Sequence, residues 1–166
     1  MKLPKLHYFD RSEFVRDEDW FTKMSPRLLI LLDTFRHLTG PCIISPNDDA
    51  IGRRTEPIDG YYDAHNYVKW GEVKGIDVFP TLEPKGLTDQ FPLEGDDDYY
   101  FMDAVVEEWV YQAEKINFGA IGIYPDWTLN GKKRPGAHLD VRDGWTTWGR
   151  IGNDYVSLDK AMEVLA

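Results

Sequence analysis

The chain has 166 residues, with 19 Lys and Arg against 29 Asp and Glu, so its formal net charge at pH 7 is -10. Hydrophobic residues make up 42% of the sequence and aromatic residues 14%. This length is typical of one compact domain, and the aromatic content is far above that of a chain too polar to form a core. We therefore predict a single domain over residues 1–166, in which residues 1–24 form a polar N-terminal extension.

Charge and apolar patterning argue against several classes of protein. Nucleic acids and anionic membranes are bound by clustered Lys and Arg, and the densest run here is only Lys132-Lys133-Arg134. The apolar run over residues 28–32 is too short to cross a bilayer, and residues 1–19 lack the apolar centre of a secretory signal. We expect a soluble protein made in the cytoplasm, without nucleic-acid or membrane partners.

Cysteine usage limits the kind of metal site that the chain can build. Cys42 is the single cysteine, so neither an intrachain disulfide nor a cysteine-based zinc finger is possible. Any metal ion must therefore be held by His, Asp and Glu.

Periodic apolar residues predict three helices. The first covers about residues 26–38, with Ser25 as its cap and a proline at its first position. The second covers about residues 103–115, where apolar side chains share one face. A short third helix, over residues 158–165, follows the capping residue Ser157.

Four short runs rich in branched or aromatic residues lie between these helices, each bounded by Gly or Pro. They are Cys42–Ser45, Gly75–Phe79, Phe118–Tyr124 and Ala137–Val141. The order of elements predicts an α+β fold: a small, mainly antiparallel sheet with helices packed on one face. Residues 46–64 and 81–98 are predicted to be irregular, and loops of this length are often functional.

His65 and His138 are the two histidines that lie beside or within a predicted strand and have a carboxylate nearby. Asp77 occupies the centre of an apolar strand, where a buried carboxylate is costly unless a cation or several donors meet it. His138 and Asp140 occupy alternate positions of another strand, so they project from the same face while their apolar neighbours face the core.

Two imidazoles and one carboxylate from separate strands could form a zinc site whose fourth position is open to water, as in catalytic zinc sites. Zinc lowers the pKa of its bound water and polarises a carbonyl group, so the expected chemistry is hydrolysis. The alternative is that these residues form hydrogen-bonded pairs with a purely structural role.

The wider sequence around these residues resembles a known family. The runs Asp-Ala-His at 63–65, Gly-Ile-Asp-Val at 75–78, Gly-Ala-Ile-Gly-Ile-Tyr-Pro at 119–125 and His-Leu-Asp-Val-Arg at 138–142 carry this resemblance. They resemble the zinc D-alanyl-D-alanine metallopeptidases, which include D-Ala-D-Ala carboxypeptidases and L-alanyl-D-glutamate endopeptidases, some of them from bacteriophages. The resemblance spans about residues 28–148 and implies the fold that this family shares with the hedgehog signalling domain.

The resemblance also implies roles for individual residues. By position, His65, Asp77 and His138 would bind the zinc ion. Several family members carry an acidic residue three positions before the second histidine, where this chain has Pro135. Asp140 is then the nearest acid and our first candidate for the general base, although it could instead fix the orientation of His138.

Other residues around the site remain open in role. Asp126 and Glu72 are further candidates for the base if their loops reach the site. Arg53 and Arg54 fall just before the first expected ligand, where a guanidinium could bind a carboxylate of a wall peptide. The alternative is a solvent-facing pair that offsets the neighbouring aspartates. Residues 66–72 are expected to be an inserted loop relative to the family.

Two functional hypotheses follow. The first is a zinc metallopeptidase that hydrolyses an amide bond in the peptidoglycan stem peptide, as a phage or prophage lysin would after reaching the cell wall. The second is a structural or wall-binding module, such as a virion component, that keeps the fold and the metal but has lost turnover. Pro135 at the position of the base supports the second hypothesis.

Overall fold

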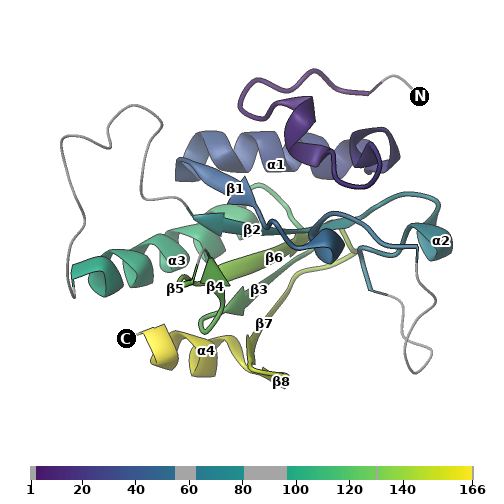
Figure 1. Cartoon of the computed structure of the whole chain (residues 1–166). Coiled ribbons are helices and arrows are strands. Elements are labelled where there is room, and N and C mark those ends of the chain that lie inside the picture. Colours follow the sequence, from purple (N-terminus) through teal and green to yellow (C-terminus); the bar gives the residue numbers. More distant parts are fainter. Residues whose placement is uncertain (1–2, 55–62, 81–96, 130, 166) are drawn as a thin grey trace.

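The computed structural model describes residues 3–54, 63–80, 97–129 and 131–165, with the backbone alone for 97–104 and 132. Its α-helices are α1 (Pro26–Thr39), α2 (Tyr67–Trp70), α3 (Asp97–Lys115) and α4 (Leu158–Leu165) (Figure 1). The strands are β1 (Cys42–Ile44), β2 (Gly75–Pro80), β3 (Ala120–Tyr124), β4 (Thr128–Leu129), β5 (Lys132–Lys133), β6 (Gly136–Asp140), β7 (Thr146–Ile151) and β8 (Asp154–Val156). Short 3-10 helices cover Arg11–Phe14, Trp20–Lys23 and Asp48–Ala50. Among the helices described, none combines the length and the apolar character needed to cross a bilayer.

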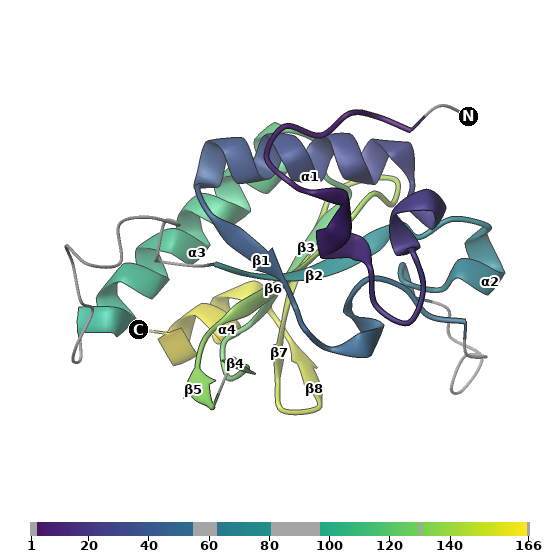
Figure 2. The same cartoon turned by 45° about the horizontal axis from the view of Figure 1, so that its top comes forward.

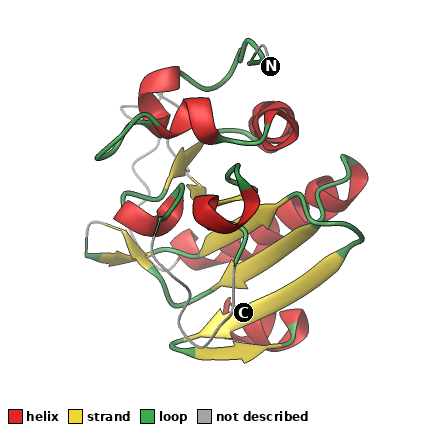
Figure 3. Cartoon of the chain, turned by 90° about the vertical axis from the view of Figure 1, so that its right-hand side faces the viewer, coloured by secondary structure: helices red, strands yellow, loops and turns green. Residues whose placement is uncertain are grey.

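Six strands form the main sheet, in the order β1-β2-β6-β3-β7-β8, and β4 and β5 form a separate pair (Figure 3). Within the described residues, neighbouring strands of the main sheet run antiparallel except β3 and β7, which run parallel. The predicted α+β class is therefore confirmed, with a mixed sheet in which antiparallel pairs dominate.

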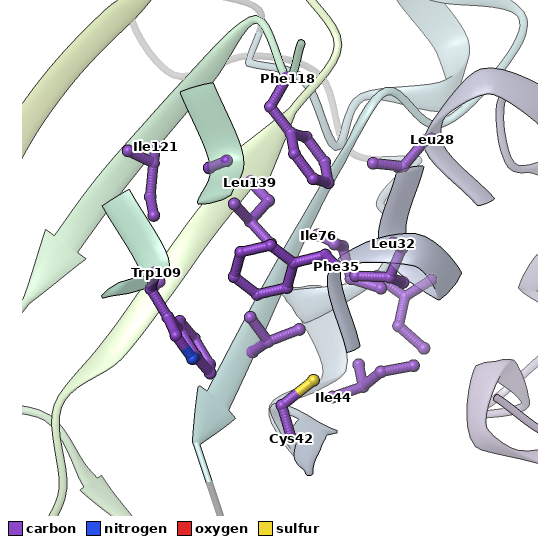
Figure 4. Packing of buried hydrophobic residues seen from close by; sticks show 14 of the residues in the cluster. Leu28, Leu32, Phe35, Cys42, Ile44, Ile76, Trp109, Phe118, Ile121 and Leu139 are labelled. Carbon is purple, nitrogen blue, oxygen red and sulfur yellow. The ribbon is translucent and has the colours of Figure 1, made fainter. Parts of the chain in front are cut away.

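Helices α1, α3 and α4 pack on one face of this sheet and bury a hydrophobic core (Figures 2 and 4). The ring of Phe35 on α1 meets Trp109 on α3 and Phe118 edge to face, at centroid distances of 5.1 and 5.8 Å. Ile121 and Leu139 face these rings from the sheet and are fully buried. Each such side chain contributes roughly 1.5–3 kcal/mol by leaving water. Because the core occupies one face of the sheet, polar side chains that alternate with the core residues must project from the opposite face.

The helix ends follow from local chemistry, with two departures from expectation. Helix α1 ends at Gly40, whose φ of 86° is readily adopted by glycine, but the Ser25 side chain makes no capping hydrogen bond. Helix α3 begins at Asp97 rather than near Asp103. Helix α4 has the predicted bounds, and the Ser157 hydroxyl accepts a hydrogen bond of 3.2 Å from a backbone N–H of its first turn.

The four predicted strands are present as β1, β2, β3 and β6, whereas β7 and β8 were not predicted. Strand β7 has a glycine in its interior, which usually weakens a strand signal. The fold uses the missing side chain, because a Cβ atom on Gly149 would lie 2.3 Å from the Cβ atom of Ala161 on α4. Close packing of a helix on the strand thus overrides local propensity.

The N-terminal segment belongs to the domain and is not a polar extension. Its buried side chains join the hydrophobic core of α1; they are Phe9, Phe14, Trp20, Phe21 and Met24. The buried Asp33 carboxylate on α1 accepts backbone N–H groups of His7, Tyr8 and Phe9 at 2.8–3.1 Å. Figure 1 shows this purple segment lying along α1. The sequence prediction missed it because its apolar residues are spaced irregularly among charged ones.

Replacement of Asp33 by alanine tests this attachment. Three backbone N–H groups would lose their charged acceptor, so we expect the free energy of unfolding to fall by about 2–3 kcal/mol in urea titrations. Glu107→Ala, on an exposed face of α3, is the control and should change it by less than about 0.5 kcal/mol. Equal stability of the two variants would contradict the role of Asp33.

Candidate metal centre

The candidate centre lies on the sheet face that the helices leave uncovered. Along β6, Ala137 and Leu139 join the core, so His138 and Asp140 project from the opposite face. Asp77 on β2 is the direct cross-strand partner of His138. Strand pairing alone therefore brings this carboxylate and this imidazole together.

His65 reaches the same point from the segment that precedes α2. The Arg53 N–H donates to the His65 carbonyl oxygen at 3.0 Å, and the Lys74 N–H donates to the Ala64 carbonyl oxygen at 2.8 Å. These two hydrogen bonds attach the segment that contains Ala64 and His65 to Arg53, which precedes it in the chain, and to Lys74, which follows it. The expected inserted loop contains the short helix α2, which directly follows this attached segment.

Three potential ligand atoms converge in a compact triangle. The His65 Nε2 atom lies 3.0 Å from His138 Nδ1 and 3.3 Å from Asp77 Oδ1, and His138 Nδ1 lies 2.9 Å from Asp77 Oδ1. Both imidazoles are buried, whereas the Asp77 side chain keeps 17% of its exposure. The sequence prediction that these three residues meet is therefore confirmed, and Asp77 gives the group an edge open to solvent.

The size of the triangle fits a small tetrahedral ion. Ligand distances of about 2.0–2.2 Å around zinc place neighbouring ligand atoms about 3.3–3.5 Å apart. The observed edges of 2.9–3.3 Å need to open by only a few tenths of an ångström to reach this spacing. His65, Asp77 and His138 form a group that could hold a metal ion.

Hydrogen bonds on the far side of each ring aim the two imidazoles. The outer nitrogen of His138, Nε2, lies 3.0 Å from Asp140 Oδ2, and the outer nitrogen of His65, Nδ1, lies 3.4 Å from the Ile51 carbonyl oxygen. Each acceptor favours a proton on the outer nitrogen, so the inner nitrogen could offer a lone pair to a metal ion once it has lost its own proton. Histidine ligands of metal ions almost always carry such a partner.

Asp140 lies behind His138 and away from the triangle. It is fully buried, and Arg142 donates to it through its backbone N–H at 3.1 Å and through its guanidinium. Burial opposes ionisation, but His138 and Arg142 outweigh it and hold the pKa of Asp140 below its usual range. In this position Asp140 can orient His138, and its role as a general base stays a prediction. The sequence analysis gave Arg142 no role at the site, although its spacing of two residues from Asp140 places both on one face of an extended chain.

The electrostatics of the centre favour a cation. Burial alone would lower the pKa of His138, but hydrogen bonds and charge from Asp140 and Asp77 raise it to about 9. Burial would likewise raise the pKa of Asp77, but His65 and His138 hold it below its usual range. Without a metal ion, a proton on His138 supplies the positive charge that the two carboxylates require.

A glycine beside His138, Gly75, makes room for its ring. Gly75 pairs with Asp140 across β2 and β6, next to the imidazole. A Cβ atom on Gly75 would lie 2.8 Å from His138 Cε1 and 2.7 Å from the Cβ atom of Ala64. The absence of a side chain at this position is therefore a condition for the observed ring position.

Arg53 and Arg54 are not members of the triangle, and each already has a carboxylate partner. Arg53 Nη2 lies 2.8 Å from Asp63 Oδ2, and Arg54 Nε lies 2.8 Å from Glu18 Oε1. Their partners are thus not the neighbouring aspartates that the alternative interpretation named. Both arginines line a cavity of about 410 Å³, together with Asp17, Trp20, Asp48, Asp49 and Gly52.

The other candidates for a general base have contacts elsewhere. Asp126 Oδ2 accepts the Gly152 N–H at 2.6 Å, and Glu72 Oε1 lies 4.0 Å from Lys74 Nζ. In the described part of the chain, neither belongs to the group of possible metal ligands.

No protein-family model matches the chain, and no curated protein or solved structure matches it either.

Metal binding should release a proton from His138. Because the pKa of His138 in the metal-free protein is about 9, its inner nitrogen is protonated at pH 7.5 and a metal ion must displace that proton. We expect zinc affinity to rise up to about tenfold per pH unit between pH 6.5 and 8.5. Calorimetric titrations in buffers of different ionisation enthalpy measure this release directly. A binding heat that is independent of the buffer would contradict it.

Proposed function

We propose that the protein is a zinc-dependent peptidase that hydrolyses an amide bond in the stem peptide of peptidoglycan. The observation that carries this proposal is the triangle of His65 Nε2, Asp77 Oδ1 and His138 Nδ1, with edges of 2.9–3.3 Å. Three protein ligands with an open edge are the arrangement of catalytic zinc sites, whereas structural zinc sites are closed by a fourth ligand. Bound there, zinc would lower the pKa of a water molecule and polarise a substrate carbonyl group.

The residues of the chain divide the remaining work. His65 and His138 would hold the ion with neutral rings, because their outer nitrogens already face the Ile51 carbonyl oxygen and Asp140. Asp77 would supply the negative charge, and its side chain is the part of the triangle that keeps some exposure to solvent, 17%. Arg142 neutralises Asp140, so that Asp140 can orient His138 without adding a second uncompensated negative charge to the centre.

The peptidoglycan substrate is supported by the sequence runs around these ligands and by the cavity that Arg53 and Arg54 line. Two arginines and three aspartates line that cavity, and its Gly52 and Arg53 directly follow Ile51, the hydrogen-bond acceptor of His65. A surface with both charges suits a peptide that carries free carboxylate and amino groups, as stem peptides do. A guanidinium binds a carboxylate in a bidentate manner, so Arg53 and Arg54 are the proposed contacts of the substrate.

A second candidate is a zinc-binding structural or wall-binding module without turnover. It is favoured by the contacts of the two carboxylates next to the ligands, which already have hydrogen-bond or ion-pair partners. Asp140 is taken by His138 and Arg142, and Asp63 accepts the His65 backbone N–H at 3.0 Å and pairs with Arg53. Neither carboxylate is free to accept a proton from an attacking water molecule.

Removal of one ligand separates the two candidates. We expect the wild-type protein to bind one equivalent of zinc and to release new amino groups from purified peptidoglycan, and chelation should abolish that release. His138→Ala should lower the rate to that of the chelated protein, because a two-ligand site no longer holds the ion. His37→Ala, which removes a histidine on α1 that stacks on Tyr8, is the matched control and should retain activity. Stoichiometric zinc without amino-group release would favour the module.

Asp140→Asn tests whether Asp140 orients His138 or acts as the base. If it orients the ring, zinc affinity should fall about 10–100-fold, because an outer partner of a histidine ligand is weakened. Competition with a chelating dye measures this affinity. Asp126→Asn is the control and should leave zinc affinity unchanged. Unchanged zinc affinity in Asp140→Asn, with loss of the rate alone, would instead assign the base to Asp140.

A further inference from the structure

The backbone over residues 51–53 supports His65 through its outer ring nitrogen and its main chain. The His65 Nδ1 atom lies 3.4 Å from the Ile51 carbonyl oxygen. The Arg53 N–H donates to the His65 carbonyl oxygen at 3.0 Å, and the Tyr67 N–H donates to the Arg53 carbonyl oxygen at 3.0 Å. Because this one stretch holds both the ring and the main chain of His65, a shift of the stretch would move the imidazole with it.

Trp20 packs against this stretch at Gly52. A Cβ atom on Gly52 would lie 2.6 Å from Cε3 and 2.7 Å from Cζ3 of the Trp20 indole, and 2.8 Å from a methyl carbon of Val73. Trp148 fills the space over Gly122 in the same way, where a Cβ atom would lie 2.3 Å from Cε2 of its indole. Gly52 does not have a positive φ, so its missing side chain serves the close contact with Trp20 and not the backbone conformation.

The Trp20 ring is itself fixed by its surroundings. It is buried, and its indole N–H donates to Asp17 Oδ1 at 3.1 Å. The ring of Tyr67 meets it edge to face at a centroid distance of 6.4 Å, and Lys23 Nζ lies 5.5 Å from the ring centroid. Gly52 therefore lies against a ring that has little freedom to move.

The N-terminal segment that carries Trp20 is also attached to the chain that follows the first proposed ligand. Val73 makes two backbone hydrogen bonds of 2.8 Å with the residues on either side of Met24. The next residue, Lys74, donates its N–H to the Ala64 carbonyl oxygen at 2.8 Å. The segment thus contacts the chain both before and after the ligand, and Trp20 makes the contact that precedes it.

We propose that Trp20 is a positioning residue of the candidate metal centre. Through Gly52 it fixes residues 51–53, which in turn hold His65 Nε2 in the ligand triangle. This inference rests on the metal binding of the proposed function and does not require hydrolysis. Three ligands bind one ion only if their atoms keep the spacing that the ion sets, so loosening the support of one ligand weakens binding. The N-terminal segment would then serve the site as well as the core.

Zinc affinity of the full chain tests this role. Zinc ions alone are the probe, because Trp20 also lines the cavity assigned to the substrate. In competition with a chelating dye, Trp20→Leu should bind zinc about tenfold more weakly, at the low end of the effect of losing a direct partner of a histidine ligand. Trp20→Phe keeps an aromatic ring beside Gly52 and should recover most of the affinity. Gly52→Ala disturbs the same contact from the other side and should weaken zinc binding to a similar extent.

Amide hydrogen exchange in the metal-free protein gives a readout that does not depend on zinc. The Arg53 and Tyr67 amides make the hydrogen bonds that join residues 51–53 to the His65 segment. In Trp20→Leu they should exchange at least about tenfold faster relative to the amide of Leu139, a core residue on β6. The comparison with Leu139 separates a local opening from a change in overall stability.

Phe14→Leu is the matched control. Phe14 is a fully buried aromatic residue of the same N-terminal segment, and it packs on Phe9 and Phe21. Its replacement should lower the free energy of unfolding, as Trp20→Leu does, but it should leave zinc affinity unchanged and should not raise the two relative exchange rates. A merely structural role of Trp20 would make the two variants alike.

The outcomes separate this inference from the proposed function. If Trp20→Leu and Gly52→Ala bind zinc as tightly as wild type, or if Phe14→Leu weakens zinc binding as much as Trp20→Leu, the positioning role is wrong and the metal centre stands. If the variants behave as expected but the zinc-loaded protein releases no amino groups from peptidoglycan, the positioning role stands and the peptidase is wrong. If the wild-type protein binds no zinc, both fall.

Discussion

The arrangement of the open sheet face depends on one electrostatic constraint, the need to offset the negative charge of Asp77 in the middle of an apolar strand. Ile76 and Val78 on either side are buried in the core, so β2 cannot turn Asp77 to solvent without losing that burial. The charge must be met where it is, by side chains from neighbouring strands and loops. His138 comes from the paired strand and His65 from a tied segment, and Asp140 with Arg142 forms the next layer outward.

This constraint also explains how much of the site the sequence predicts. A carboxylate in an apolar strand and a histidine at alternate spacing from an aspartate are visible in the residues alone, and they led to the group that the structure brings together. His65 required more, because nothing in its local sequence shows that the bonds from Arg53 and Lys74 carry it to the strands. For Asp140 the sequence leaves two roles open, a general base or the partner that orients His138, because a strand face places it beside His138 without showing what else it contacts.

The secondary structure likewise contains elements that the sequence predicts and elements that it does not. Regular apolar spacing predicted α1, α4 and four strands, because in those elements local propensity and burial agree. The prediction missed β7, β8 and the packed N-terminal segment, where distant contacts decide. Gly149 is suited to a strand only because Ala161 approaches it, and residues 7–9 are held only because Asp33 faces them from a helix. Trp148 belongs to the same class, because the space over Gly122 that admits its ring appears only when β3 and β7 are paired.

Gly75 and Gly122 also limit which substitutions this surface can accept. Positions around a functional centre are commonly varied by exchanging one side chain for another, yet here two positions beside His138 are occupied by neighbouring rings. Even an alanine at either one would push the imidazole or the indole aside. Changes in specificity would have to come from the surrounding loops, so closely related sequences should diverge there while these two small residues persist.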